Sequence, residues 1–177
     1  YGADTTLVDW EIAEIGGESR KWNLTQDVSG DFLAANPHAD RLGNKLVWLF
    51  LDGRGGPSLL AEPVRDHTGH PGLNFWGNGD NPCVMVNSTD QPITVWTTLP
   101  PKSLFVHPAP DGPVAIGWVS PISGKVQITG RVVDGHPGGT NGVGWRLEKQ
   151  SQDLSVPLHQ LAEHSAQRAA LFARRAE

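Results

Sequence analysis

The sequence predicts an all-β fold, a sandwich of jelly-roll type, followed by one C-terminal α-helix. Two features of the sequence lead to this fold class. Short apolar runs recur along the chain, and several of them alternate apolar with polar residues, which is the period of a half-buried strand. The 177 residues also include 21 glycines and 14 prolines, a composition that favours short strands joined by turns over long helices.

The clearest strand is expected over residues 6–15, where Val8, Trp10 and Ile12 share the face that points to the core. One helical turn is expected over residues 31–36, before a proline. The other expected strands span residues 20–24, 45–51, 73–76, 83–86, 93–96, 102–106, 114–119, 125–133 and 141–148. Strands at such close intervals are typical of a β-sandwich or jelly roll.

The character of the chain changes towards its C-terminus. Leu154, Leu158 and Leu161 recur at a spacing that places them on one face of an amphipathic helix. We therefore expect residues 1–150 to form the sandwich domain and residues 151–177 to form a connector helix that leads to a neighbouring domain.

Charge and composition exclude several functional classes. The formal net charge is −5 and no basic run precedes the last ten residues, which argues against a nucleic-acid partner. No apolar run is long enough for a membrane span. The single cysteine, Cys83, cannot form an internal disulfide, and its strand-like surroundings favour a buried, inert thiol.

Several motifs occur in order along the chain. They are Asn36-Pro-His-Ala-Asp-Arg-Leu-Gly-Asn44, Phe105-Val-His-Pro-Ala-Pro-Asp-Gly-Pro-Val-Ala-Ile-Gly-Trp118, Gly130-Arg-Val-Val-Asp-Gly-His-Pro-Gly-Gly139 and Gly142-Val-Gly-Trp-Arg-Leu147. With these motifs, residues 7–147 resemble a β-sandwich domain of unknown function that is inserted in large multidomain cytochrome c proteins of planctomycetes. The second half is also similar to galactose-binding-like jelly rolls. The resemblance implies a periplasmic or extracellular location, beside a haem-bearing module that is separate from this chain.

The long stretch of residues 52–82 is rich in Gly, Pro, Asn and Asp, and loops of this length inside a compact domain are usually functional or mobile. Within it, Trp76 is the best candidate for an exposed platform against the face of a sugar ring. Asn74, Asn78 and Asp80 would supply planar groups that hydrogen-bond to sugar hydroxyls. The alternative for Trp76 is core packing, the role expected for most of the seven tryptophans.

The glycine-rich loop over residues 134–142 is a second candidate site. Asp134 and Asn141, with main-chain carbonyls, offer the oxygen ligands that calcium prefers, and His136 could contact a ligand there. The alternative is an ordinary hairpin loop in which Asp134 and Asn141 cap turns. No other cofactor is expected. His67 and His70 are spaced for a metal, but two loop histidines alone are a weak signal for zinc, and solvated histidines are the default.

The sequence contains no G-x-S-x-G, H-E-x-x-H, P-loop or dinucleotide motif, so we expect no enzymatic activity. The leading hypothesis is a non-catalytic binding module, for a polysaccharide or oligosaccharide, within a larger extracytoplasmic protein. The alternative is a structural domain that contacts neighbouring domains or a second copy through the C-terminal helix or an open sheet edge. A third hypothesis, a hydrolase, predicts a deep cleft that contains two carboxylates.

Overall fold

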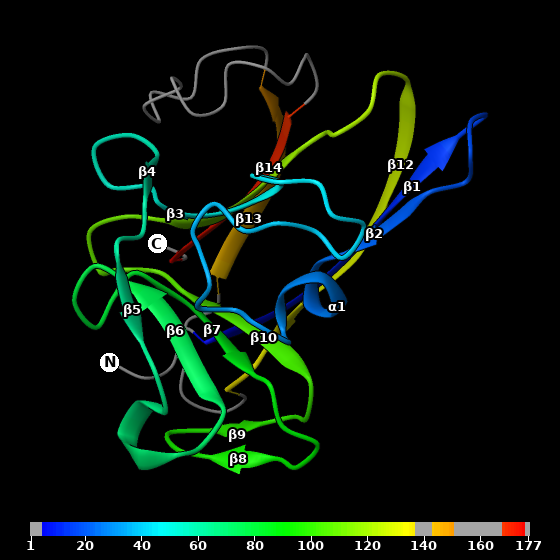
Figure 1. Cartoon of the computed structure of the whole chain (residues 1–177). Coiled ribbons are helices and arrows are strands. Elements are labelled where there is room, and N and C mark those ends of the chain that lie inside the picture. Colours follow the sequence, from blue (N-terminus) through cyan, green and yellow to red (C-terminus); the bar gives the residue numbers. More distant parts are fainter. Residues whose placement is uncertain (1–4, 137–142, 151–167, 176–177) are drawn as a thin grey trace.

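The computed structural model describes residues 5–136, 143–150 and 168–175. Two large sheets dominate it (Figure 1). The seven-stranded sheet contains, in order, β12 (Lys125–Asp134), β1 (Thr6–Ile15), β10 (Ser103–His107), β7 (Cys83–Asn87), β6 (Leu73–Gly77) and β5 (Glu62–Val64), with β2 (Lys21–Asn23) also paired to β1. The five-stranded sheet contains β13 (Val143–Gln150), β14 (Arg168–Arg175), β11 (Val114–Val119), β3 (Trp48–Asp52) and β4 (Ser58–Leu59). The prediction of an all-β fold is confirmed.

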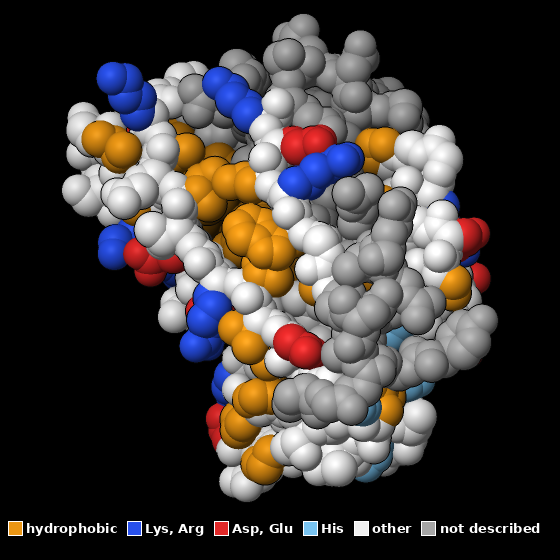
Figure 2. Space-filling view, turned by 180° about the vertical axis from the view of Figure 1, so that it is seen from behind, with side chains coloured by type: hydrophobic (Ala, Val, Ile, Leu, Met, Phe, Trp, Pro, Cys, Tyr) orange, Lys and Arg blue, Asp and Glu red, His pale blue; other side chains and the backbone are white. Residues whose placement is uncertain are grey.

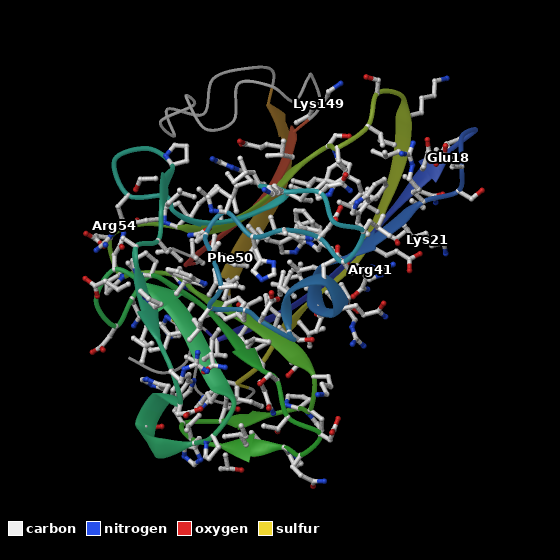
Figure 3. All side chains as sticks on the ribbon, in the orientation of Figure 1. Glu18, Lys21, Arg41, Phe50, Arg54 and Lys149 are labelled. Carbon is white, nitrogen blue, oxygen red and sulfur yellow. The ribbon has the colours of Figure 1, made fainter. Side chains whose placement is uncertain are left out.

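The two sheets curl around one main core, to which both contribute side chains. Phe50 lies in the middle of the molecule, whereas Glu18 and Arg54 lie at its periphery (Figure 3). Two pairs of indole rings meet edge to face inside this core, with centroids 6.2 Å apart for Trp10 and Trp48 and 5.4 Å apart for the pair of Trp22 and Trp118. Edge-to-face contacts are the arrangement that the quadrupoles of aromatic rings favour.

Strand β1 matches its sequence pattern over its whole length. Val8, Trp10 and Ile12 are buried, and the side chains between them point to the other face of the sheet. The strand pairs antiparallel with β12 at every position, from Thr6 opposite Asp134 to Ile15 opposite Lys125. The alternation of apolar and polar residues predicts this strand because one of its faces packs on the core and the other faces solvent.

Strand β3 is buried on both faces, as the continuous apolar run over residues 45–51 predicts. Trp48 and Phe50 belong to the main core, whereas Leu49 and Leu51 belong to a smaller cluster on the opposite side of the sheet. The outer side of the seven-stranded sheet has its own apolar cluster, part of which comes from the small sheet of β8 (Ile93–Thr94) and β9 (Thr98–Leu99).

The C-terminal segment differs from the prediction. Residues 168–175 form strand β14, which pairs with β13 on one side and with β11 on the other. The prediction of a helix is therefore wrong for these residues. A strand between two neighbours forms main-chain hydrogen bonds on both sides, and this tertiary pairing overrides the helix propensity of an alanine-rich segment. The rest of the connector helix that was expected over residues 151–177, namely residues 151–167 and 176–177, lies outside the described residues.

Two short helices complete the description: α1 (Leu24–Val28) and the 3₁₀ turn η1 (His67–Gly69). The sequence reasoning missed α1, although Asn23 caps it by accepting a hydrogen bond from the main-chain N of Gln26 at 3.0 Å. The expected helical turn over residues 31–36 is instead a non-helical turn with one main-chain hydrogen bond, from Ala34 N to Asp31 O. No helix among the described residues is long and apolar enough to cross a membrane.

Candidate functional site

Trp76 is not an exposed platform. It lies in β6, only 8% of it is exposed, and its ring belongs to the main core. Its indole Nε1 donates a hydrogen bond of 2.9 Å to the main-chain O of Phe32. The strand expected over residues 73–76 is present, but it is flanked by β5 and β7 and buried on both faces, so the prediction of an exposed Trp76 was wrong.

The three polar residues that were expected beside Trp76 lie in different places. Asn74 shares the inward face of β6 with Trp76 and is largely buried. Asn78 holds structure together, because its Nδ2 donates to Asp52 Oδ2 at 3.0 Å and its Oδ1 accepts from the main-chain N of Ala61 at 3.0 Å. Asp80 is exposed. These residues therefore do not form one binding surface around an indole ring.

The second predicted site is described only in part. Asp134 Oδ1 accepts a hydrogen bond of 2.8 Å from the main-chain N of His136, which is the short turn expected of a hairpin loop. Nδ1 of His136 is buried and has no hydrogen-bond partner among the described residues. Asn141 lies outside the described residues, so the calcium site stays a prediction. Within the described part of the chain, no three His, Cys, Asp or Glu side chains are grouped in a way that could hold a metal ion.

His67 has a packing role in the structure. Its ring contacts Phe75 and Trp96 edge to face, with centroid distances of 4.9 and 6.0 Å. Burial lowers the pKa of His67, against the smaller opposite effect of the Asp80 charge. A neutral imidazole between two aromatic rings accounts for this residue without a metal.

A polar pocket opens where β1 leaves β10. The two strands pair only at Thr6 and Leu7, and β1 is joined by β2 from Glu11 onward. The space between is bordered by α1, by the residues that precede β10 and by β12, and its volume is about 450 Å³. Its polar side chains are those of Asp9, Asn23, Thr25, Gln26, Ser29, Lys102, Ser103 and Arg131.

A second pocket of about 420 Å³ adjoins the first at Ser29, which lines both. It lies between residues 29–34 and the ends of β6 and β7. Its polar side chains are those of Ser29, Asp31, Arg65, Asp66, Asn74 and Ser88. We call the two pockets together the polar groove. Of the described residues that were predicted from sequence to bind a ligand, Asn74 alone lines it.

The polar groove offers several planar hydrogen-bond donors. Asn74 accepts from the main-chain N of Asp66 through Oδ1 at 3.1 Å, and its Nδ2 group has no partner among the described residues. Within the same part of the chain, the side chains of Gln26, Arg65 and Arg131 also have no hydrogen-bond or ion-pair partner. Amide and guanidinium groups of this kind bind two neighbouring oxygens at once.

The charges along the polar groove nearly balance. Three carboxylates, those of Asp9, Asp31 and Asp66, are accompanied by three cations, those of Arg65, Lys102 and Arg131. Lys102 is partly engaged, because its Nζ donates to the main-chain O of Ser88 at 2.6 Å and lies 3.4 Å from Asp90 Oδ1. The groove therefore favours neither an anionic nor a cationic ligand.

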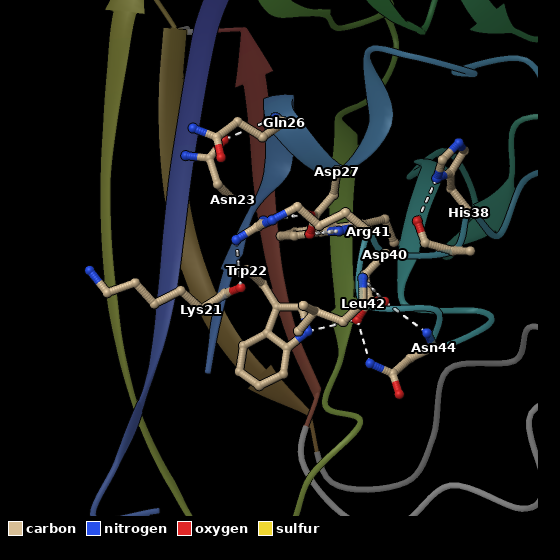
Figure 4. Close-up of polar contacts among 12 residues, drawn as sticks. Lys21, Trp22, Asn23, Gln26, Asp27, His38, Asp40, Arg41, Leu42 and Asn44 are labelled. Carbon is tan, nitrogen blue, oxygen red and sulfur yellow. Dashed lines mark hydrogen bonds and ion pairs between the residues drawn. The ribbon is translucent and has the colours of Figure 1, made fainter. Parts of the chain in front are cut away.

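A buried pair of carboxylates, Asp27 and Asp40, is the arrangement closest to an acid–base site (Figure 4). Asp27 accepts hydrogen bonds from Arg41 Nη1 at 2.6 Å and from Trp48 Nε1 at 2.9 Å. Asp40 accepts from Trp22 Nε1 at 2.7 Å and from Asn44, through its main-chain N at 2.8 Å and its Nδ2 at 2.7 Å.

Both carboxylates are thus occupied by groups of the protein itself. Burial raises the pKa of Asp27, against the lowering effect of its hydrogen bonds from Trp48 and Arg41. Neither Asp27 nor Asp40 lines the polar groove. The pair fastens the motif over residues 36–44 to the core, which is a structural role.

Comparisons with known proteins leave the chain without an assigned family: no family model, no curated protein and no solved structure matches it. The resemblance to an inserted domain of planctomycetal cytochrome c proteins therefore stays an expectation. Apart from Asn74, the groove residues were missed by sequence reasoning. The other local signal was the N-cap of α1 at Asn23. Asp9, Gln26 and Arg131 come together only through the fold.

Proposed function

We propose that this chain is a non-catalytic binding module for a neutral carbohydrate chain and that the polar groove is its site. The observation that supports this most directly is a set of planar donors along the groove that have no partner among the described residues, from Gln26 and Arg131 in one pocket to Arg65 and Asn74 in the other. Such donors suit the vicinal hydroxyls of a sugar ring. The two adjoining pockets together suit a ligand longer than one monosaccharide.

The ligand class follows from what the groove contains. Near-balanced charges do not favour phosphate, sulfate or a polyamine, whereas a neutral polyhydroxyl chain uses donors and acceptors alike. The apolar surface of Pro100 and Pro101 in the first pocket can contact the hydrophobic face of a sugar. The module would act within a larger periplasmic or extracellular protein, as the resemblance of the sequence implies.

Affinity electrophoresis against a panel of neutral and anionic polysaccharides tests the proposal. We expect retardation by at least one neutral polysaccharide. Gln26→Ala and Arg131→Ala should each weaken that binding by about two- to tenfold, the loss of one or two hydrogen bonds to an uncharged partner. The matched control is Gln91→Ala, because Gln91 is exposed and lines neither pocket.

Three results would contradict this function. The first is the absence of retardation by any neutral polysaccharide in a broad panel. The second is binding that Gln26→Ala and Gln91→Ala weaken equally, since the groove would then not be the site. The third is shortening of the polysaccharide during incubation, which would favour the hydrolase hypothesis and would call for carboxylates of the groove, such as Asp31 and Asp66, as the catalytic pair.

The alternative function, an interaction domain without a small ligand, is favoured by a different observation. Strands β12 and β13 are the end strands of their sheets, and neither has a second neighbour strand in the part of the chain that the structure describes. The β12 edge adjoins the polar groove, because Arg131 of β12 also lines its first pocket, and the edge leads to a separate proposal.

A further inference from the structure

We infer that the free edge of β12 pairs antiparallel with β12 of a second copy of this chain, so that two seven-stranded sheets become one continuous sheet. This inference goes beyond carbohydrate binding and does not rest on it. β12 has β1 as its only strand neighbour among the described residues, and the two strands run side by side in Figure 1. An end strand with free main-chain groups is a template for another strand.

The direction of the main-chain groups of β12 can be derived from the β1–β12 ladder. The main-chain N of Gly135 donates to the O of Thr5 at 2.8 Å, so the groups of residue 135 point towards β1. Successive residues of a strand direct these groups to opposite neighbours. The N–H and C=O groups of Val126, Ile128, Gly130 and Val132 therefore point to the free edge.

The edge carries only some of the features by which proteins usually prevent such pairing. Over residues 125–133 there is no proline and the register with β1 is unbroken. Lys125 and Arg131 place their charges on the outward face, and Asp134, at the end of β12, is the one charged residue at an inward position of this strand. Val126, Ile128 and Val132 lie on the inward face and are only partly buried against the core. Lys125, Gln127, Thr129, Arg131 and Val133 alternate with them on the outward face and are exposed.

The order of residues along this edge is self-complementary in one register. With Thr129 of both copies at the twofold axis, Val126 lies opposite Val132 of the second copy and Ile128 lies opposite Gly130 of the second copy. The large side chain of Ile128 thus lies opposite a glycine, which has no side chain. All four of these residues direct their main-chain groups to the edge, so the register forms about eight main-chain hydrogen bonds.

Each of the two neighbouring registers contains a less favourable cross-strand pair. A slide of two residues one way places Lys125 of each copy opposite Arg131 of the other, two like-charge pairs on the outward face. The opposite slide places Asp134 of each copy opposite the apolar Val126. In the favoured register Arg131 lies opposite Gln127 of the second copy and Lys125 lies opposite Val133 of the second copy.

Apolar side chains are also exposed on the five-stranded sheet. Trp145 of β13 lies opposite Ala173 of β14, which lies opposite Val114 of β11, so Trp145 shares the inward face with a fully buried core residue. Even so, 58% of Trp145 and 47% of Leu147 are exposed. Figure 2 shows hydrophobic side chains gathered on the face seen from behind, with charged side chains around them.

The register can be tested by a charged substitution at an exposed position of β12. Gln127 is exposed and lies opposite Ala13 on β1, so a charge there meets no ion across the ladder within its own chain. Gln127→Glu would place a carboxylate opposite Arg131 of the second copy twice per dimer, whereas Gln127→Lys would create two like-charge pairs. The matched controls are Gln91→Glu and Gln91→Lys, which change the net charge equally at an exposed site outside β12.

The measurement is sedimentation equilibrium of the full chain over a range from about 1 µM to about 500 µM. We expect a monomer–dimer equilibrium, which Gln127→Glu tightens and Gln127→Lys weakens by about three- to tenfold each, with smaller effects at high salt. Near-ultraviolet circular dichroism verifies that each variant is folded. A chain that stays monomeric throughout overturns the inference. A dimer that responds to the Gln127 and Gln91 pairs equally also overturns it, because the contact would then lie outside β12.

Discussion

Trp22 and Asp40, which are 18 residues apart in the sequence, are joined in the core by a hydrogen bond of 2.7 Å from indole Nε1 to Oδ2. The neighbouring pair of Trp48 and Asp27 repeats the arrangement at 2.9 Å. Each indole N–H is thereby satisfied inside an apolar core, and each carboxylate gains a partner that carries no charge. The two pairs explain how a core rich in tryptophan holds a polar segment such as residues 36–44.

The first prediction concerns Asp40. Asp40→Ala would leave the N–H of Trp22 and the main-chain N–H groups of Leu42 and Asn44 without their acceptor. We expect the free energy of unfolding, measured with urea, to fall by about 2–4 kcal/mol. The control is Asp90→Ala, because the side chain of Asp90 is 86% exposed and its one ion pair, with Lys102, should matter little. Equal effects of the two substitutions would show that the Asp40 network does not support the fold.

The second prediction compares Trp76 and Trp145, whose burial cannot be predicted correctly from the sequence alone. Trp76→Ala removes a buried ring and its hydrogen bond to Phe32 O, and we expect the free energy of unfolding to fall by about 3–5 kcal/mol. Trp145→Ala removes a ring that is mostly exposed, and the loss should stay below about 1 kcal/mol at concentrations where the chain is monomeric. Urea unfolding followed by circular dichroism measures both. A mild Trp76 variant would contradict its place in the core.

A strand could be predicted from the sequence where its own residues show the alternation of buried and exposed side chains. β1 was predicted over its full length because its alternation reports a strand with one buried face. β14 was not, because the partners that make it a strand lie elsewhere in the chain and its own composition favours a helix. The same holds for Trp76, whose surroundings in sequence are polar but whose strand lies between two others.

The candidate site was harder to predict than the fold for a related reason. Asn74 could be found because its residue type and polar context indicate hydrogen bonding to a ligand. Gln26 and Arg131 could not, because they are 105 positions apart and meet only where β1 separates from β10. A site built from loop ends and from a gap between strands leaves no periodic pattern in the sequence.

The third prediction concerns the thiol of Cys83, which was expected to be buried and inert. Burial raises its pKa to about 12, with a smaller contribution from the Asp80 charge. The nucleophilic thiolate is therefore almost absent at neutral pH, and the residue is only 4% exposed. We expect labelling by an aromatic disulfide reagent to proceed at the rate at which the protein opens, and to become fast in denaturing urea. Rapid labelling of the native chain would contradict the buried position.

The last prediction uses two carboxylates whose pKa values move in opposite directions. Burial alone would raise the pKa of Asp52, but hydrogen bonds from Arg54 and Asn78 outweigh it, and the pKa is lowered. The pKa of Asp27 is raised by burial. A lowered pKa in the folded state stabilises the protein above the unfolded pKa, and this contribution is lost as the pH falls through the folded value. A raised pKa has the opposite sign: the protonated folded state gains stability as the pH falls.

Urea unfolding from about pH 6 to about pH 3 tests both signs against the unmodified chain. The stability advantage of the unmodified chain over Asp52→Asn should shrink by about 1 kcal/mol as the pH falls, because the carboxyl group of Asp52 takes up a proton at a higher pH in the unfolded chain than in the folded chain. Its advantage over Asp27→Asn should instead grow in the same direction, since protonation removes the cost of a buried charge. The two variants thus control for each other, as each exchanges a buried carboxylate for an amide of the same shape. Parallel pH profiles for the two would contradict the assignment, because they would place Asp27 and Asp52 in equivalent electrostatic surroundings.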